Sequence, residues 1–341
     1  MKILMIGRGI LATMYGWALA RAGHSVEFYV RPGRAAEYGP TVAIDLLDTR
    51  TKLQGVQVRD TFATRFVEDL PADHGYDLIV VSVQHYRFAE VVEFLTGRIG
   101  NATVLLFSNL WTDPHEAVSS LPADQLVWGF PGAGGSFGPG GVARGGLLKN
   151  VKFGDFGMDS RSGSRALPTP RERAVREFFR GAGFGIQVQH DFRGWLWTHF
   201  LINTGLLSQA LKAGSFAELM SSDAHLRQAV LNVRELLQVL AARGVDLKLH
   251  NADLGLFRLP PGFVALVLRV AFRWIPLVRR LIQAALPGDD LEREVKPTSR
   301  DMLLEAQRLG IAVPRLAAFE AQFAEGMESS DISPAPRIAA S

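Results

Sequence analysis

Two polar side chains stand in the otherwise apolar segment "WLWTHFLINTG", residues 195–205. His199 and Asn203 are four residues apart, a spacing that places both on the same face of a helix. A histidine can hand over a proton near neutral pH, and an asparagine can donate a hydrogen bond to an oxygen that gains negative charge. Two interpretations stay open: a catalytic pair, or a buried pair that satisfies its own hydrogen bonds.

A second chemical signature is "GRGILA", Gly7 to Ala12, which follows the apolar run 2–6 and opens a helical pattern that ends at Gly23. The run 25–30 then supplies a second strand. In this setting one glycine allows a tight turn, the next lets the backbone approach a pyrophosphate, and a small third residue lets helix and strand pack closely. The free N–H groups at the helix start attract phosphate. We expect a dinucleotide site formed by Gly7, Arg8, Gly9, Ile10, Leu11 and Ala12. A signal peptide is the other interpretation of this apolar N-terminus, but Arg8 interrupts it.

The end of the second strand selects the cofactor. A carboxylate there binds the ribose hydroxyls of NAD, whereas an arginine accommodates the 2′-phosphate of NADP. The sequence is "VRPGR", with Arg31 and Arg34 and no carboxylate before Glu37. It predicts NADP, unless both arginines belong to a solvated loop. Two further buried runs, 77–83 and 103–107, end at Gln84 and Asn109, which we expect to contact the nicotinamide side of the cofactor.

Composition narrows the class of protein. The 341 residues carry a net charge of +3 and no cysteine. Thiolate metal sites, disulfides and cysteine nucleophiles are therefore excluded, and nothing indicates a metal site. The mild basicity gives little support to nucleic-acid binding. No run reaches the length of a membrane span, and the lack of cysteine fits a cytoplasmic protein.

The order of elements predicts the fold class. The segment 41–60 alternates in two runs, which indicates a hairpin, and the glycine-rich segment 129–146 indicates a mobile flap or a turn between strands rather than a P-loop. After residue 191 helical patterns dominate, among them 223–244 and 291–310. We expect an α/β Rossmann domain (mostly parallel sheet, doubly wound) at 1–190, an all-α C-terminal domain at 191–327, and a disordered tail at 328–341.

The segment 260–288 is apolar and punctuated by Arg269, Arg273, Arg279 and Arg280. Three interpretations stay open: two core helices broken at Pro276 whose arginines reach outward to solvent, an apolar wall for a substrate or a second subunit, and a membrane-surface helix.

In the order and spacing of these motifs the chain resembles the ketopantoate reductases (2-dehydropantoate 2-reductases). The resemblance rests on "IGRGILA", the strand-end Arg31, the asparagine of "LLFSNL", the W-x-H-x-x-x-N helix and "GIAVP" at residues 310–314. It implies an NADPH-dependent reductase of a 2-keto acid with its active site between the domains. The family's catalytic lysine position holds His199, its asparagine matches Asn203, and its substrate-binding glutamate matches Glu294.

Several of the positions that bind substrate in the family pattern carry other residues in this chain. Lysine has become histidine, a second asparagine falls at about Leu207, and the family's serine-containing substrate helix is "LVRRLIQ" here. We therefore expect NADPH-dependent hydride transfer to the carbonyl of a 2-keto acid or related small molecule. His199 would be the proton donor, Glu294 and Asn203 would assist, and Arg279 or Arg280 would bind a substrate carboxylate. The alternatives are an imine reductase, an alcohol dehydrogenase or a non-catalytic NADP-binding protein; a homodimer is expected.

Overall fold

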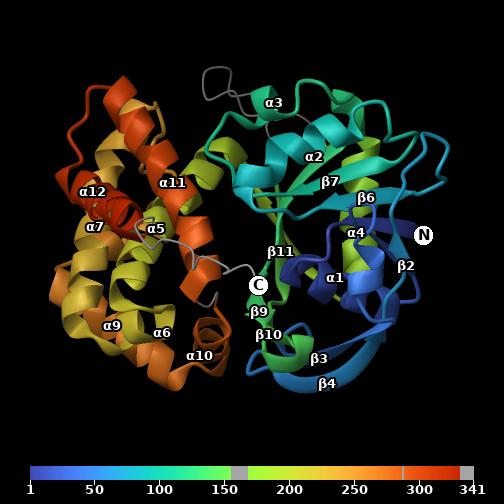
Figure 1. Ribbon diagram of the computed structural model, residues 1–341, viewed down its shortest axis with the longest axis horizontal. Helices are drawn as coiled ribbons and strands as arrows, with labels where there is room; N and C mark the ends of the chain where they lie inside the picture. Colours follow the sequence, from blue (N-terminus) through green and yellow to red (C-terminus); the bar gives the residue numbers. More distant parts are fainter. Residues whose placement is uncertain (155–167, 286–287, 331–341) are drawn as a thin grey trace, which may run out of the picture.

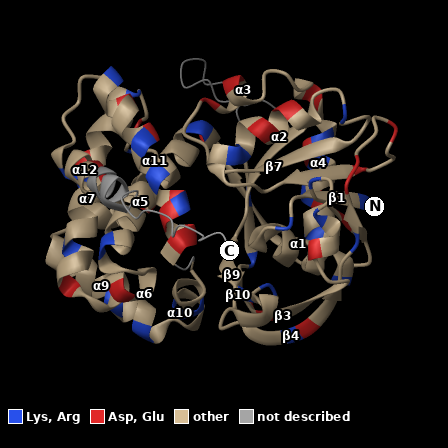
Figure 2. Cartoon of the chain, viewed as in Figure 1, with Lys and Arg blue, Asp and Glu red and all other residues tan. Residues whose placement is uncertain are grey.

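The chain folds into a strand-rich part and a helical part that lie side by side (Figure 1). The computed structural model describes residues 1–154, 168–285 and 288–330. Helices replace strands between Gln189 and Phe192, and charged residues of both signs are spread over both parts (Figure 2). The predicted fold class, a mostly parallel α/β part followed by a helical part, is confirmed. The division into domains at residues 190 and 327 stays a prediction.

An eight-stranded sheet organises the first part, in the order β12-β11-β8-β7-β6-β1-β2-β5. Neighbouring strands are parallel except β8 and β11. The strands are β1 (Lys2–Ile6), β2 (Ser25–Tyr29), β5 (Phe66–Val67), β6 (Leu78–Val81), β7 (Thr103–Phe107), β8 (Leu126–Phe130), β11 (Asn150–Gly154) and β12 (Gly185–Gln189).

Helices cover both faces of this sheet. They are α1 (Ile10–Arg21), α2 (Phe88–Leu95), α3 (Pro114–Ala117) and α4 (Pro170–Gly181). Successive side chains of a strand face opposite ways, so Ile3 and Met5 of β1 share a core with α1 and α4. Leu4 and Ile6 share the opposite core with α2. The sheet is therefore doubly wound, as the apolar runs of its central strands predict.

A second sheet has the order β4-β3-β10-β9. Strands β3 (Thr41–Asp48) and β4 (Val56–Ala63) form the expected antiparallel hairpin. The glycine-rich segment forms another hairpin from β9 (Ala133–Phe137) and β10 (Ala143–Leu147). Gly135 pairs with Gly145 there, and a Cβ on either would collide with the facing backbone. Close strand approach, rather than phosphate binding, explains Gly135 and Gly145.

The helical part contains α5 (Phe192–Ala213), α6 (Phe216–Ser221), α7 (Asp223–Ala242), α8 (Asn251–Leu254), α9 (Pro261–Trp274), α10 (Pro276–Gln283), α11 (Gly288–Arg308) and α12 (Pro314–Ser330). Helix α5 joins the two parts: Trp195 and Leu196 belong to the core of the large sheet, whereas Phe200 and Leu201 belong to the helical core. Residues between these two sets, His199 among them, therefore lie where the two parts meet.

The segment 260–288 forms two helices, α9 and α10, that meet at Pro276 with a bend of 94°. Within the described ranges, no single helix is long and apolar enough to cross a membrane; this bent pair meets the criteria of length and composition only when taken together. Helix α12 runs three residues into the predicted tail 328–341, and the rest of that tail lies outside the described residues.

Candidate active site

The carboxyl ends of β1, β6, β7 and β8 share one edge of the sheet because these strands are parallel neighbours. Gly7 follows β1 with a left-handed φ of 81°, and Gly9 is the N-cap residue of α1. A Cβ at either glycine would meet nothing within 4 Å, so the space above the turn is open. No side chain caps the helix start, which leaves the N–H groups of Ile10, Leu11 and Ala12 without a side-chain partner from the cap residue.

Several buried polar atoms around this edge have no hydrogen-bond partner among the described residues. The guanidinium of Arg8 lies between the rings of Tyr38 and Phe137, 4.8 and 4.9 Å from their centroids, and its Nε is buried and unpartnered. The same holds for Ser82 Oγ after β6 and for Ser108 Oγ and Asn109 Oδ1 after β7. Buried polar groups normally find partners, so these residues fit a polar ligand such as a dinucleotide at this edge. Gln84 is exposed beside them.

The two arginines after β2 differ in their surroundings. Arg31 is exposed, whereas the Nε of Arg34 lies 2.7 Å from a carboxylate oxygen of Glu37. Arg31 therefore remains available to a phosphate, and Arg34 is partly occupied by its neighbour three residues on.

His199 and Asn203 share a face of α5, and Asn203 Nδ2 lies 3.1 Å from His199 Nε2. With this amide hydrogen directed at Nε2, the ring hydrogen is carried by Nδ1. The imidazole stacks on Trp195 at 5.2 Å and meets the edge of Phe130 at 4.6 Å. Burial, and next the positive charge of Lys152, lowers the pKa of His199 to about 4. The imidazole is therefore neutral at neutral pH.

Lys152 is a site residue that sequence reasoning missed. It lies on β11 opposite Phe130 of β8, and its Nζ stands 4.9 Å above the Trp195 ring. Lys152 and His199 line a cavity of about 550 Å³ at the carboxyl end of β8. The alternation in "VKFGDFG" separates Lys152 from Val151 and Phe153, but the pattern alone does not say which face meets α5.

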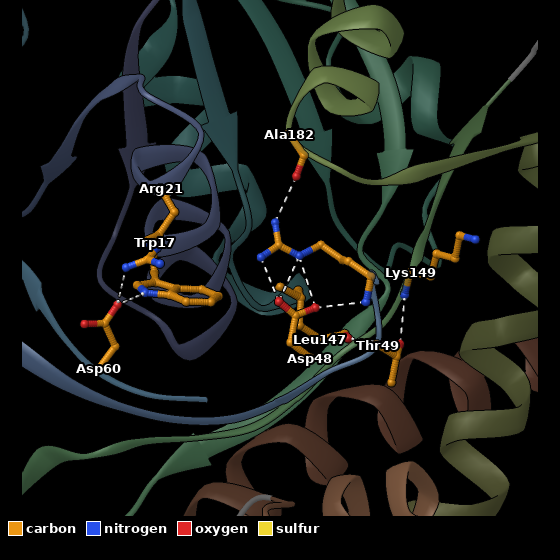
Figure 3. Close-up of polar contacts among 9 residues, drawn as sticks. Trp17, Arg21, Asp48, Thr49, Asp60, Leu147, Lys149 and Ala182 are labelled. Atoms are coloured by element: carbon orange, nitrogen blue, oxygen red, sulfur yellow. Dashed lines mark hydrogen bonds and ion pairs between the residues drawn. The ribbon is translucent and has the colours of Figure 1, made fainter. Parts of the chain in front are cut away.

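A polar network includes Thr49 and Lys149, two of the residues that line this cavity (Figure 3). Thr49 Oγ1 donates to the Leu147 carbonyl at 3.2 Å and accepts the N–H of Lys149 at 3.1 Å. Beside it, Asp48 accepts two side-chain nitrogens of Arg50 at 2.7 and 3.1 Å, and Arg50 also donates to the Ala182 carbonyl. Apolar side chains complete the wall: Leu53, Phe130, Ala133, Leu148, Trp195, Leu277 and Leu281. The lining also includes Lys149, Lys152 and Asp253, so the cavity combines apolar walls with charged residues of both signs.

Glu294 lies on α11 and faces the segment after β6. Burial raises its pKa and the charge of His85 partly offsets this; its Oε2 is buried without a described partner. Glu294 is not among the residues that line the cavity, and it does not act on the titration of His199. Glu294 is therefore not a cause of the His199 pKa, which burial and Lys152 lower.

The two arginines of α10 do not line the cavity either. Arg280 forms an ion pair with Asp45 at 2.9 Å and donates to the Asp45 and Gly145 carbonyls at 2.6 and 3.3 Å. Arg279 is exposed. The contacts of Arg280 therefore join α10 to the second sheet.

A glycine turn, an open helix N-terminus and orphaned polar atoms at the carboxyl edge of a doubly wound sheet define a dinucleotide-binding fold. Residues 3–157 match the family model of the ketopantoate reductase PanE/ApbA. This match covers less than half of the chain, and for the strand-rich part it confirms the resemblance inferred from the sequence. A comparison with curated protein sequences gave no significant match.

Solved structures share the fold along nearly the whole chain. A PanE/ApbA family ketopantoate reductase from Ralstonia eutropha JMP134 is 19% identical, with a TM-score of 0.66 and 97% and 100% of the two chains covered. D-mandelate dehydrogenase, with NADH and anilino(oxo)acetate, is 14% identical (TM-score 0.66; 98% and 100% covered). A dimeric ketopantoate reductase from Staphylococcus aureus is 13% identical (TM-score 0.63; 96% and 99% covered).

Proposed function

We propose that the protein is an NADP(H)-dependent oxidoreductase that transfers hydride to the carbonyl of a 2-keto acid with a bulky apolar side group. The observation that carries this proposal is the cavity of about 550 Å³, in which His199 and Lys152 meet apolar walls at the carboxyl end of β8. Lys149 and Lys152 suit a carboxylate, and Phe130, Leu277 and Leu281 suit an apolar substituent.

The residues of the turn and of the strand ends would hold the cofactor. The N–H groups at the start of α1 and Arg8 suit the pyrophosphate, and Arg31 suits the 2′-phosphate. Ser108, Asn109 and Gln84 suit the nicotinamide side. NADPH, when bound, supplies the hydride.

His199 and Lys152 together would take the roles that the resemblance assigns to a single lysine: a hydrogen bond and a positive charge at the carbonyl oxygen. Negative charge grows on the carbonyl oxygen during hydride addition, and a fixed positive charge in a water-poor site stabilises it. Because His199 is neutral at neutral pH, it would serve as a hydrogen-bond donor through Nδ1, and the Lys152 ammonium would supply both the positive charge and the proton that the alkoxide takes up. The proton-donor role expected for His199 requires the imidazolium, which burial disfavours; Asn203 fixes the ring tautomer.

The test is a panel of 2-keto acids, from small to aryl-substituted, assayed with NADPH against wild type, His199→Ala and Lys152→Met. We expect turnover to favour the bulky substrates and to fall about 100-fold or more in either variant. Turnover that is unchanged in both variants would remove this site from the mechanism.

Oxidation of a 2-hydroxy acid is a second candidate. A neutral imidazole can accept the proton that leaves a hydroxyl group, and the lowered pKa of His199 keeps it neutral. Assays with the oxidised cofactor and 2-hydroxy acids, including mandelate, compare the two directions.

We also propose a cytoplasmic homodimer. A row of exposed apolar side chains marks α9: Phe263, Leu266, Val270 and Trp274 are 51%, 52%, 48% and 71% exposed. Their spacing of three and four residues forms one continuous stripe. Such a stripe suits contact with a second copy of the chain, and one structural neighbour is dimeric.

A further inference from the structure

The loop that follows β2 folds around a carboxylate from another strand. Strand β2 pairs in parallel with β5, with Tyr29 opposite Val67, and the Val30 N–H donates to the Val67 carbonyl at 2.9 Å. The residue that directly follows β5 is Glu68. Glu68 therefore stands beside the residue that ends β2, where a carboxylate or an arginine distinguishes NAD from NADP in this fold.

The contact is made by backbone amides. The Ala35 N–H donates to Glu68 Oε1 at 2.6 Å. The backbone amides of Ala35, Gly33 and Arg34 lower the pKa of this carboxylate, Ala35 most strongly, although the Arg34 N–H itself donates to the Arg31 carbonyl at 3.0 Å. Gly33 adopts a left-handed φ of 80°, a conformation that turns successive amides towards one point and forms a small anion-binding concavity. In this chain the concavity is filled by the protein's own carboxylate.

The groups around this loop include both an arginine that favours a 2′-phosphate and a carboxylate that disfavours it. Pro32 offers no N–H, and Arg34 is paired with Glu37 at 2.7 Å. Arg31 is exposed and forms no ion pair with any residue that the structure describes. A 2′-phosphate bound by Arg31 would therefore find the nearby amides already occupied and a like charge beside them.

We propose that Glu68 is the residue that sets the choice of cofactor, acting against the preference for NADP that Arg31 confers. It takes the place of the strand-end carboxylate of NAD-binding sites but reaches that place from β5 instead of β2. The inference rests on the proposed function only in that the chain binds a nicotinamide dinucleotide; it needs no knowledge of the substrate.

Fluorescence titration of wild type and Glu68→Gln with NADPH and with NADH, at low ionic strength, tests this proposal. Glutamine keeps an oxygen that can accept the Ala35 N–H and removes the charge. We expect the ratio of Kd for NADH to Kd for NADPH to rise about tenfold, which corresponds to about 1.4 kcal/mol, mainly through tighter NADPH binding. Glu68→Ala, which leaves the amides free, is the second variant in case the first one folds poorly.

Asp69→Asn is the matched control because it neutralises the adjacent, exposed carboxylate, which accepts the N–H of Leu70 and lies outside the concavity. A ratio that stays the same in both Glu68 variants, or that rises equally in Asp69→Asn, would overturn the role of Glu68. Wild-type protein that binds neither cofactor would refute the proposed function itself, and this inference with it.

Discussion

At the scale of single residues, the structure places a lysine close to the helix position at which the family pattern has its lysine. The lysine expected on α5 is replaced by His199, and a lysine is present on the facing strand as Lys152. The two side chains share the cavity and the same aromatic neighbour, Trp195. In the proposed site the positive charge therefore lies on the sheet, and the helix carries a neutral hydrogen-bonding group.

Removal of the Lys152 charge should change the titration of His199. In Lys152→Met we expect the pKa of His199 to rise above about 4 but to stay below 6.5, because burial is the larger cause and remains. NMR titration of the imidazole signals measures this shift. Lys149→Met is the control, since Lys149 lines the same cavity but is not a cause of the shift. An unchanged pKa of His199 in Lys152→Met would show that the Lys152 charge does not act on His199.

The neutral state of His199 also makes stability depend on pH. Its folded pKa lies below the unfolded value of about 6.5, so the unfolded state binds more protons between these values. The free energy of unfolding should then fall as pH falls from about 6.5 to about 4, by up to about 3 kcal/mol for this group. Denaturant unfolding of wild type and His199→Gln at pH 7 and pH 4.5 isolates the contribution. An equal loss of stability in both proteins would contradict it.

At the scale of elements, α10 is attached to the second sheet through Arg280. Its ion pair and carbonyl contacts with Asp45 and Gly145 are made to β3 and β10. The same helix places Leu277 and Leu281 in the cavity wall. The arginine thus holds the wall in position, which differs from the substrate contact expected from the sequence.

The two roles predict different results for Arg280→Gln. As a structural link, its loss should lower the free energy of unfolding by about 1–2 kcal/mol, and Arg279→Gln, an exposed control on the same helix, should leave stability unchanged. Chemical denaturation of both variants measures this. A KM for the 2-keto acid that rises at least tenfold while stability is unchanged would instead restore Arg280 as the substrate's partner.

Local sequence patterns predict those elements whose causes are local. The buried runs of β1, β6 and β7, the turn at Gly7 and the hairpin of β3 and β4 follow from periodicity and glycine chemistry. Lys152 and Glu68 were missed because their roles depend on which strands become neighbours: Lys152 acts across the β8–β11 pair, and Glu68 follows a strand of only two residues. Because these partners are far apart in the sequence, no short motif reveals their contact.

Helix α11 also shows that a local sequence signal does not decide the structure alone. A proline inside a helix normally kinks or breaks it, yet α11 runs from Gly288 to Arg308 with Pro297 inside. The buried residues Leu291, Val295 and Met302 anchor α11 to the helical core on both sides of the proline. Tertiary packing therefore outweighs the local cost of the proline, and it keeps Glu294 on the same continuous helix as the residues of that core.

At the scale of the whole molecule, the apolar stripe of α9 should control assembly. An isologous dimer would bring two copies of the stripe together, so a charge placed at its centre would be buried without a partner. We expect wild-type protein to sediment as a dimer and Leu266→Glu as a monomer at micromolar concentration. Leu304→Glu is the matched control, because Leu304 of α11 is 54% exposed against 52% for Leu266 and lies outside the stripe. A wild-type monomer, or dimers in both variants, would exclude the stripe as the interface.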